Sequence, residues 1–202
     1  MSEPRSFTQA PPSNAKVGRE QETRLMCYTV LGSEEGFHGQ AFSVRVDTVR
    51  RPDGETMQVE VVDHPQAVTL VPLDGDGNLW FVRQYRHSCG KVMLELPAGT
   101  LEPGETPEAC AVRECREEIG MSPGRIGRLG GFYLAPGYST EYLHLYLVGA
   151  LTPAPLDPDD DEDLQIEKVP LTGLARLVES GRLEDAKSLA GLLLARRHLM
   201  PT

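Results

Sequence analysis

The chain has 202 residues, 40% of them hydrophobic and 25% charged, which suits one folded domain with a small additional element. Its formal net charge of −10 argues against general binding of nucleic acid, because a phosphate backbone is bound by a basic face. A small anionic substrate remains compatible with this charge, since a bound divalent cation can invert the local field.

The cysteines and the N-terminus carry no sign of export. Cys27, Cys89, Cys110 and Cys115 show no CxxC spacing and predict neither a zinc site nor a disulfide framework. The first residues lack the apolar stretch of a signal peptide, and no run approaches the roughly eighteen apolar residues of a membrane span. We therefore expect a cytoplasmic protein with no membrane partner.

The N-terminal third divides into two segments. Residues 1–22 are rich in Ser, Pro, Asn and Gln and are predicted to be a disordered arm. Residues 23–64 are expected to form an antiparallel β-element with strands at 24–31, 41–50 and 57–62. A hairpin-turn signal, Arg-Pro-Asp-Gly-Glu, joins the last two strands. This element could serve in dimerisation or in covering a substrate.

Residues 65–202 are expected to form the main domain. Its predicted strands are 67–73, 79–84, 92–96, 125–133, 142–151 and 165–169, and its predicted helices are 107–119, 171–180 and 184–199. The turn Asp-Gly-Asp-Gly-Asn joins the first two strands, and 97–105 is predicted to be a loop. The acidic stretch 157–163 is read as a solvated loop rather than a metal site.

The first of these helices has clear end signals and an acidic edge. Thr106 is a good N-cap, Pro107 suits the first helical position, and Gly120 is a common C-terminal stop. At about 100° per residue, three glutamates fall within an arc of about 100°. They are Glu114, Glu117 and Glu118. An opposite arc, predicted to pack on the sheet, holds Ala109, Val112, Cys115 and Ile119.

Three carboxylates on one helix edge repel one another unless a cation neutralises them. Their hard oxygens suit Mg²⁺ or Mn²⁺ and disfavour zinc. Taken alone, the same edge is also explained as a solvated acidic surface.

The spacing of the whole segment decides between these readings. From Gly99 to Met121 it matches Gly-x5-Glu-x7-Arg-Glu-U-x-Glu-Glu-x-Gly-U, with U apolar, at every fixed position. It therefore resembles the signature of the Nudix hydrolases, a family with a mixed β-sheet sandwiched between helices (α/β, or α+β). Cys115 stands where the family usually has an aliphatic residue, and a buried Cys behaves as a small hydrophobe.

The resemblance implies roles for individual residues. It assigns Glu114, Glu117 and Glu118 as metal ligands, with the main-chain carbonyl of Ala98 as a further one. Gly99, lacking a Cβ, would let backbone approach a metal–phosphate assembly closely. It also implies that Glu105 and Arg113 are a pair in which the arginine orients the metal-binding carboxylates.

Outside the signature the chain is similar to the ADP-ribose pyrophosphatase branch. The segments Val82–Arg86 and Leu94–Gly99 look like its approach to the signature, and Pro136 lies sixteen residues beyond Gly120, as in that branch. The loop 135–141 resembles its catalytic loop, which makes Glu141 the candidate general base. A surface glutamate at a strand edge is the alternative.

Two arginines are candidates for substrate binding. Arg86 matches a position that contacts phosphate or ribose in relatives, and a guanidinium suits such contacts. Arg83 is explained equally well as an exposed strand residue. Relatives often carry an arginine where this chain has Val59, so the substrate could differ from ADP-ribose.

The relatives form homodimers by exchanging N-terminal strands, with aromatic residues around the adenine. Tyr28 and Phe42 are possible contributors, and a core role explains them as well. The leading hypothesis is thus a homodimeric, divalent-metal-dependent hydrolase that converts ADP-ribose to AMP and ribose 5-phosphate. The alternatives are a hydrolase of another nucleoside diphosphate derivative, such as a sugar nucleotide or a dinucleotide, and a non-catalytic ADP-ribose sensor, against which the intact glutamates argue.

Overall fold

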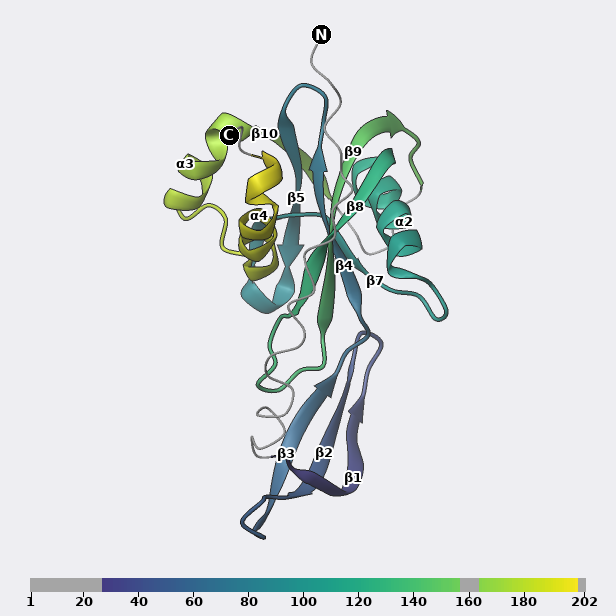
Figure 1. Cartoon of the computed structure of the whole chain (residues 1–202), viewed down its shortest axis with the longest axis vertical. Helices are drawn as coiled ribbons and strands as arrows, with labels where there is room; N and C mark the ends of the chain where they lie inside the picture. Colours follow the sequence, from purple (N-terminus) through teal and green to yellow (C-terminus); the bar gives the residue numbers. More distant parts are fainter. Residues whose placement is uncertain (1–26, 157–163, 200–202) are drawn as a thin grey trace, which may run out of the picture. The chain divides into compact units, whose positions relative to one another are not determined.

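The computed structural model describes residues 27–156 and 164–199 (Figure 1). The predicted disordered arm at 1–22 and the acidic stretch at 157–163 lie outside these residues. The described residues fall into two compact units: one comprises those up to His64 together with Ala135–Thr140, and the other comprises Pro65–Leu134 and the described residues from Glu141 onward.

The first unit is built on a three-stranded antiparallel sheet in the order β1-β2-β3. Its strands are β1 (Thr29–His38), β2 (Ser43–Arg50) and β3 (Thr56–Asp63). Hydrogen bonds between the main chains of Arg51 and Glu55 and of Gly54 and Arg51 close the β2–β3 turn, which confirms the predicted hairpin. The segment 135–140 joins this unit because the main-chain atoms of Val62 hydrogen-bond to those of Tyr138 and Thr140.

The second unit contains a mixed seven-stranded sheet, ordered β10-β5-β4-β9-β8, in which β6 pairs with β5 and β7 with β4. Its strands are β4 (Ala67–Leu73), β5 (Asn78–Arg86), β6 (Lys91–Glu95), β7 (Ala98–Thr100), β8 (Met121–Tyr133), β9 (Tyr142–Pro153) and β10 (Gln165–Pro170). Its helices are α2 (Pro107–Ile119), α3 (Leu174–Glu179) and α4 (Ala186–Leu199), with short 3-10 turns η1 (His87–Cys89) and η2 (Leu171–Gly173). Only β4 and β9 pair in parallel among these strands.

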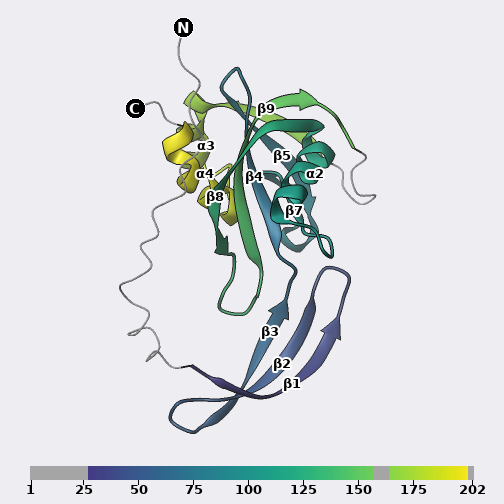
Figure 2. The same cartoon turned by 45° about the vertical axis from the view of Figure 1, so that its right-hand side comes forward.

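Helices α2 and α4 cover opposite faces of this sheet (Figure 2). Successive residues of a strand point to opposite faces, so β4 supplies both cores. Val68 and Leu70 belong to the cluster that packs under α2. Val71 instead faces Gly191 of α4, where an added Cβ would lie 3.9 Å from its Cγ2. The predicted fold class, a mixed sheet between helices with a separate antiparallel element, is confirmed.

Most predicted elements agree with the structure, and four differ: the strand predicted at 125–133 begins four residues earlier, at Met121, directly after α2, and the other three are as follows. The first strand begins at Thr29 and extends to His38, later than the predicted 24–31. The predicted loop after Leu96 contains the short strand β7, and the predicted helix 171–180 is divided into η2 and α3. A three-residue strand, Ala-Gly-Thr, is too short to show any alternation of polar and apolar residues. No helix of the described residues is both long and apolar enough to cross a bilayer.

The turn between β4 and β5 is organised by one carboxylate. Asp74 Oδ1 accepts hydrogen bonds from the main-chain amides of Asp76 (3.0 Å) and Asn78 (2.8 Å), and Oδ2 accepts one from Trp80 Nε1 (2.9 Å). Burial alone would raise the pKa of Asp74, but these hydrogen bonds together lower it below its ordinary value. The ionised carboxylate therefore stabilises the folded turn.

We expect Asp74→Ala to lower the free energy of unfolding by about 1–3 kcal/mol, because the buried indole N–H of Trp80 loses its acceptor. Asp76→Ala, at an exposed position of the same turn, is the control and should leave stability unchanged. Urea denaturation measures both. The difference in the free energy of unfolding between wild type and Asp74→Ala should be largest at pH values above the ordinary pKa of aspartate. It should shrink as the pH falls towards the lowered pKa of Asp74 in the folded protein. Equal stability of the two variants would contradict this account.

Candidate active site

The candidate site lies along the edge of helix α2 that faces strand β7. The N-cap hydroxyl of Thr106 accepts a hydrogen bond from the amide of Ala109 (3.2 Å), and Gly120 ends the helix at a positive φ of 69°, as predicted. The buried residues of α2 are Cys110, Ala111, Glu114, Cys115, Glu118 and Ile119.

This burial corrects the predicted orientation of the helix. Cys115 and Ile119 pack on the sheet as expected, but Ala109 is exposed. Two of the three glutamates are also inside: Glu114 is 6% exposed and Glu118 is 5% exposed. The acidic edge is therefore covered by β7 rather than solvated, because this unpredicted strand lies beneath it.

Gly99 on β7 makes this close packing possible. A Cβ added to Gly99 would lie 1.8 Å from the carboxyl carbon of Glu114. No real Cβ tolerates such a contact, so any side chain at this position would expel the glutamate. The requirement for glycine at the start of the signature thus has a steric cause: its backbone forms the floor on which the Glu114 carboxylate rests.

The neighbouring residue holds a second carboxylate. The amide N–H of Ala98 donates a hydrogen bond of 2.9 Å to Glu118 Oε2. The structure therefore brings Ala98 to the predicted ligands through its amide. The metal-binding role proposed for its carbonyl stays a prediction.

Arg113 joins the remaining carboxylates. Its Nε and Nη2 bind the two oxygens of Glu105 at 3.0 and 2.9 Å. Its Nη1 donates both to Glu114 (2.7 Å) and to Glu117 (2.8 Å), and Nη2 also donates to the carbonyl of Thr100 (3.0 Å). One guanidinium thus links the loop before α2, strand β7 and the acidic edge of the helix.

The electrostatic effect of this arrangement is mutual. The hydrogen bond from Arg113 lowers the pKa of Glu105, and the amide of Glu102 lowers it further. The hydrogen bond to Glu105, followed by the attraction of Glu114, raises the pKa of Arg113 above its ordinary value. Both groups therefore stay charged at any physiological pH.

The donor set fits a hard divalent cation. Every candidate ligand is an oxygen, as Mg²⁺ and Mn²⁺ prefer, and Gly99 leaves room for a carboxylate directly against the backbone. Within the described residues, however, no group of three or more His, Cys, Asp or Glu side chains is arranged to hold a metal ion. Glu114 and Glu117 are gathered around Arg113 instead. A cation would have to compete with this guanidinium for their oxygens.

Arg86, at the end of β5, is paired with a different carboxylate, that of Glu95. Its Nε and Nη2 bind Glu95 Oε1 and Oε2, both at 2.8 Å. This hydrogen bonding raises the pKa of Arg86 despite partial burial, and the charges of Glu95, Glu118 and Asp185 raise it further. The influence of Glu118 connects Arg86 to the acidic edge of α2.

Arg83 is in a different environment from Arg86. The two residues are three positions apart on β5 and so point to opposite faces of the sheet. Arg83 is exposed and lies 3.5 Å from Glu167 on β10. The structure therefore does not bring Arg83 and Arg86 together, and the substrate-binding role of Arg83 stays a prediction that these contacts do not favour.

Glu141 immediately precedes strand β9. Its main-chain carbonyl accepts a hydrogen bond from the amide of Leu134 (3.2 Å), which closes the base of the loop 135–140. The residue is half-buried. Its proposed role as general base stays a prediction.

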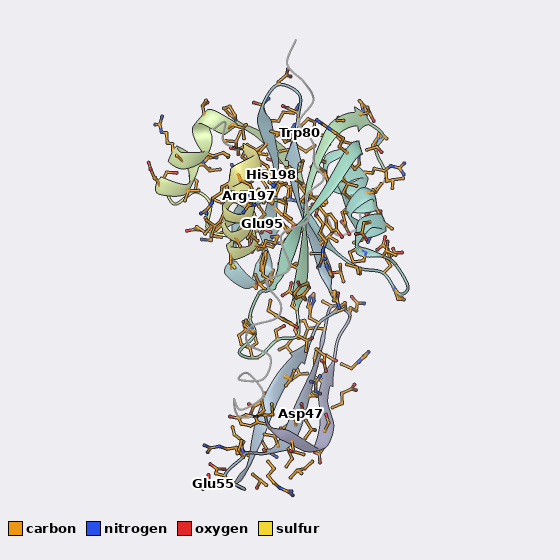
Figure 3. The ribbon with its side chains drawn as sticks, in the orientation of Figure 1. Asp47, Glu55, Trp80, Glu95, Arg197 and His198 are labelled. Atoms are coloured by element: carbon orange, nitrogen blue, oxygen red, sulfur yellow. The ribbon has the colours of Figure 1, made fainter. Side chains whose placement is uncertain are left out.

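Sequence reasoning missed two charged residues near Arg86. Glu95 is 2% exposed, and its carboxylate contacts both Arg86 and Lys187 (Figure 3 labels Glu95 beside α4). A signal for each was present in the sequence. Glu95 is the lone charge in the predicted strand 92–96, and Lys187 is a cation in the first turn of a predicted helix, where the helix dipole disfavours it.

Comparison with known proteins identifies the family. The model of the NUDIX domain matches residues 63–192. An ADP-ribose pyrophosphatase of Mycobacterium tuberculosis is 36% identical over 82% of this chain and 82% of its own length. An ADP-ribose pyrophosphatase of Bacillus subtilis is 33% identical over 78% of this chain and 86% of its own. A crystal structure of an ADP compounds hydrolase superposes with a TM-score of 0.78 at 26% identity, covering 85% of this chain and 94% of that one. This chain is therefore a member of the Nudix hydrolase family.

Proposed function

We propose that this Nudix pyrophosphohydrolase cleaves the diphosphate linkage of ADP-ribose, releasing AMP and ribose 5-phosphate, with Mg²⁺ or Mn²⁺ as cofactor. The observation that carries the proposal is the cluster of Glu105, Arg113, Glu114 and Glu117 against β7. The two relatives named ADP-ribose pyrophosphatase support the choice of substrate, since each aligns over more than three quarters of this chain.

The proposed metal ligands are the carboxylates of Glu114, Glu117 and Glu118 and the carbonyl of Ala98. When bound, a divalent cation supplies charge neutralisation for the diphosphate and acidifies an attacking water. Arg113 and Glu105 act as positioning residues, because their bidentate pair fixes the guanidinium that in turn holds Glu114 and Glu117.

The remaining proposed roles belong to Glu141, Arg86 and Gly99. Glu141 is the proposed base: it takes a proton from water as oxygen attacks one phosphorus. The bond from that phosphorus to the bridging oxygen breaks, and the other phosphate group leaves. Arg86 is the proposed contact to the substrate's phosphate or ribose, with Gly99 allowing close approach of backbone.

A second candidate substrate class is another nucleoside diphosphate derivative. It is favoured by Val59, which replaces an arginine that reaches the substrate in similar proteins. The structural neighbour named ADP compounds hydrolase is in keeping with this broader class. A purely sensory role is disfavoured, because Glu114, Glu117 and Glu118 would have no reason to be kept in a protein that does not hydrolyse.

We further propose that the protein acts as a cytoplasmic homodimer joined through its N-terminal element. Every residue of β1 is exposed, and its apolar members Val30 and Phe37 are 59% and 54% exposed. An exposed edge strand with apolar side chains is a surface suited to pairing with another chain.

A substrate panel tests the proposed function. Purified protein with Mg²⁺ or Mn²⁺ is given ADP-ribose, sugar nucleotides, NADH, diadenosine polyphosphates and 8-oxo-dGTP, and the products are identified by chromatography and mass spectrometry. We expect the highest kcat/KM for ADP-ribose, with AMP and ribose 5-phosphate as products. A higher kcat/KM for a sugar nucleotide would favour the second class, and no hydrolysis of any compound would overturn the proposal.

Glu118→Gln should lower kcat at least about a hundredfold, because a neutral amide is a much weaker ligand for a divalent cation than a carboxylate. The amide oxygen can still accept from Ala98, so the melting temperature should change little. Glu102→Gln, at an exposed position of the same loop–helix segment, carries the same change in charge and should retain full activity. Wild-type turnover by Glu118→Gln would refute the assignment.

Glu141→Gln should lower kcat by about 10²–10⁴-fold, the usual contribution of a general base. Binding of Mn²⁺, followed by isothermal titration calorimetry, should stay near the wild-type level, because Glu141 is not among the proposed ligands. If kcat matches wild type, Glu141 is not the base. If Mn²⁺ binding falls with kcat, the residue is a metal ligand instead.

A further inference from the structure

We propose that Lys187 is a positioning residue for substrate binding: acting through Glu95, it holds the guanidinium of Arg86 in its binding orientation. This inference rests on the role proposed above for Arg86. It concerns residues of β5, β6 and α4, which share one compact unit.

Glu95 is the centre of the arrangement. Its side chain is 3% exposed, and a buried carboxylate is costly unless it is paired on all sides. Burial would raise its pKa, but Arg86 and Lys187 outweigh that effect and lower the pKa to about 2. Glu95 is therefore a fixed negative charge between two cations.

Arg86 offers only part of its guanidinium to Glu95. Nε and Nη2 make the bidentate contact, and Nη1 has no hydrogen-bond partner within the described part of the chain. The side chain is 39% exposed. The orientation of the Glu95 carboxylate therefore dictates where Nη1 points, because a fork-shaped pair permits little rotation.

Lys187 fixes that orientation from the other side. Its Nζ contacts Glu95 Oε2, the same oxygen that binds Arg86 Nη2, and lies 3.1 Å from Asp185 Oδ2. Asp185 also caps helix α4 by accepting hydrogen bonds from the amide (3.0 Å) and the hydroxyl (2.5 Å) of Ser188. The lysine is thus anchored to the start of a helix.

The location of Lys187 is not explained by helix formation. It is 8% exposed and stands in the first turn of α4, where a cation is disfavoured by the helix dipole. Ser188 already ties this turn to the sheet, since its hydroxyl accepts a hydrogen bond of 2.7 Å from the amide of Leu96. What Lys187 adds is the charge that balances Glu95 and Asp185.

Without Lys187, Arg86 would be the sole cation in contact with Glu95 among the described residues. Asp185 also attracts Arg86, so the guanidinium would be drawn towards two carboxylates and away from its paired orientation. A contact made equally by substrate and transition state affects KM rather than kcat. Loss of Lys187 should therefore weaken substrate binding and spare the chemical step.

The test measures kcat and KM with the panel compound of highest kcat/KM, expected to be ADP-ribose. Lys187→Met should raise KM about tenfold, equivalent to about 1.4 kcal/mol, with kcat within about twofold of wild type. Lys187→Arg, which keeps the charge, should recover most of the loss. Lys91→Met removes a lysine that pairs with Glu184 at 48% exposure and is the control for lost surface charge; its KM should be unchanged.

A double variant separates positioning from mere stability. In an Arg86→Ala background, Lys187→Met should raise KM no further, because the group it orients is gone. It should still lower the melting temperature. A further rise in KM in that background, or a wild-type KM for Lys187→Met alone, would overturn the inference and leave the proposed function standing. If wild type hydrolyses no compound of the panel, the proposed function fails and this inference with it.

Discussion

The site depends on one guanidinium that holds several like charges together. Glu105, Glu114 and Glu117 carry like charges that repel one another, and Arg113 binds all three: Nε and Nη2 bind Glu105, and Nη1 binds both Glu114 and Glu117. Because Nη1 serves both Glu114 and Glu117, a divalent cation that recruits either carboxylate must weaken its bond to Arg113. Arg113 thus stabilises the acidic edge in the folded protein, and a metal that used these carboxylates would have to overcome their bonds to it.

Strand β7 packs against the acidic edge of α2 and fixes the position of two of its carboxylates. At Gly99 the strand has no side chain, so the Glu114 carboxylate can lie against its backbone. At Ala98 the main-chain amide donates a hydrogen bond to Glu118. Both glutamates that it contacts are nearly buried. Backbone and nearly buried carboxylates thus define this edge in the folded protein, and a cation that bound there would have to displace Arg113 from Glu114 or Glu117.

The bounds of helix α2 were predicted well from the sequence, because capping residues are local signals. Thr106, Pro107 and Gly120 define the helix in the structure as they do in the sequence. Helical periodicity placed Glu114 and Glu118 on one edge of the helix, away from the arc predicted to pack on the sheet, but it does not reveal that a strand such as β7 lies beside that edge. The contact of Glu95 with Lys187 joins residues 92 positions apart, and no spacing rule covers such a pair. The only sequence signals were the lone charged residue within the predicted strand 92–96, Glu95, and a cation in the first turn of a helix, Lys187.

The separation of two strands leaves room for one stretch of chain that contacts both α2 and α4. β4 and β5 pair at a single position, Leu73 with Leu79, and then separate. The space is filled by one stretch of chain, in which β6 pairs with β5 and β7 pairs with β4. This stretch carries Glu95, which faces α4 through Lys187, and then Ala98 and Gly99, which face α2 through Glu118 and Glu114. Arg86 is bound by the first of these groups and feels the charge of Glu118. Because this one stretch lies between the separating strands, residues of both helices contact it from opposite faces of the sheet.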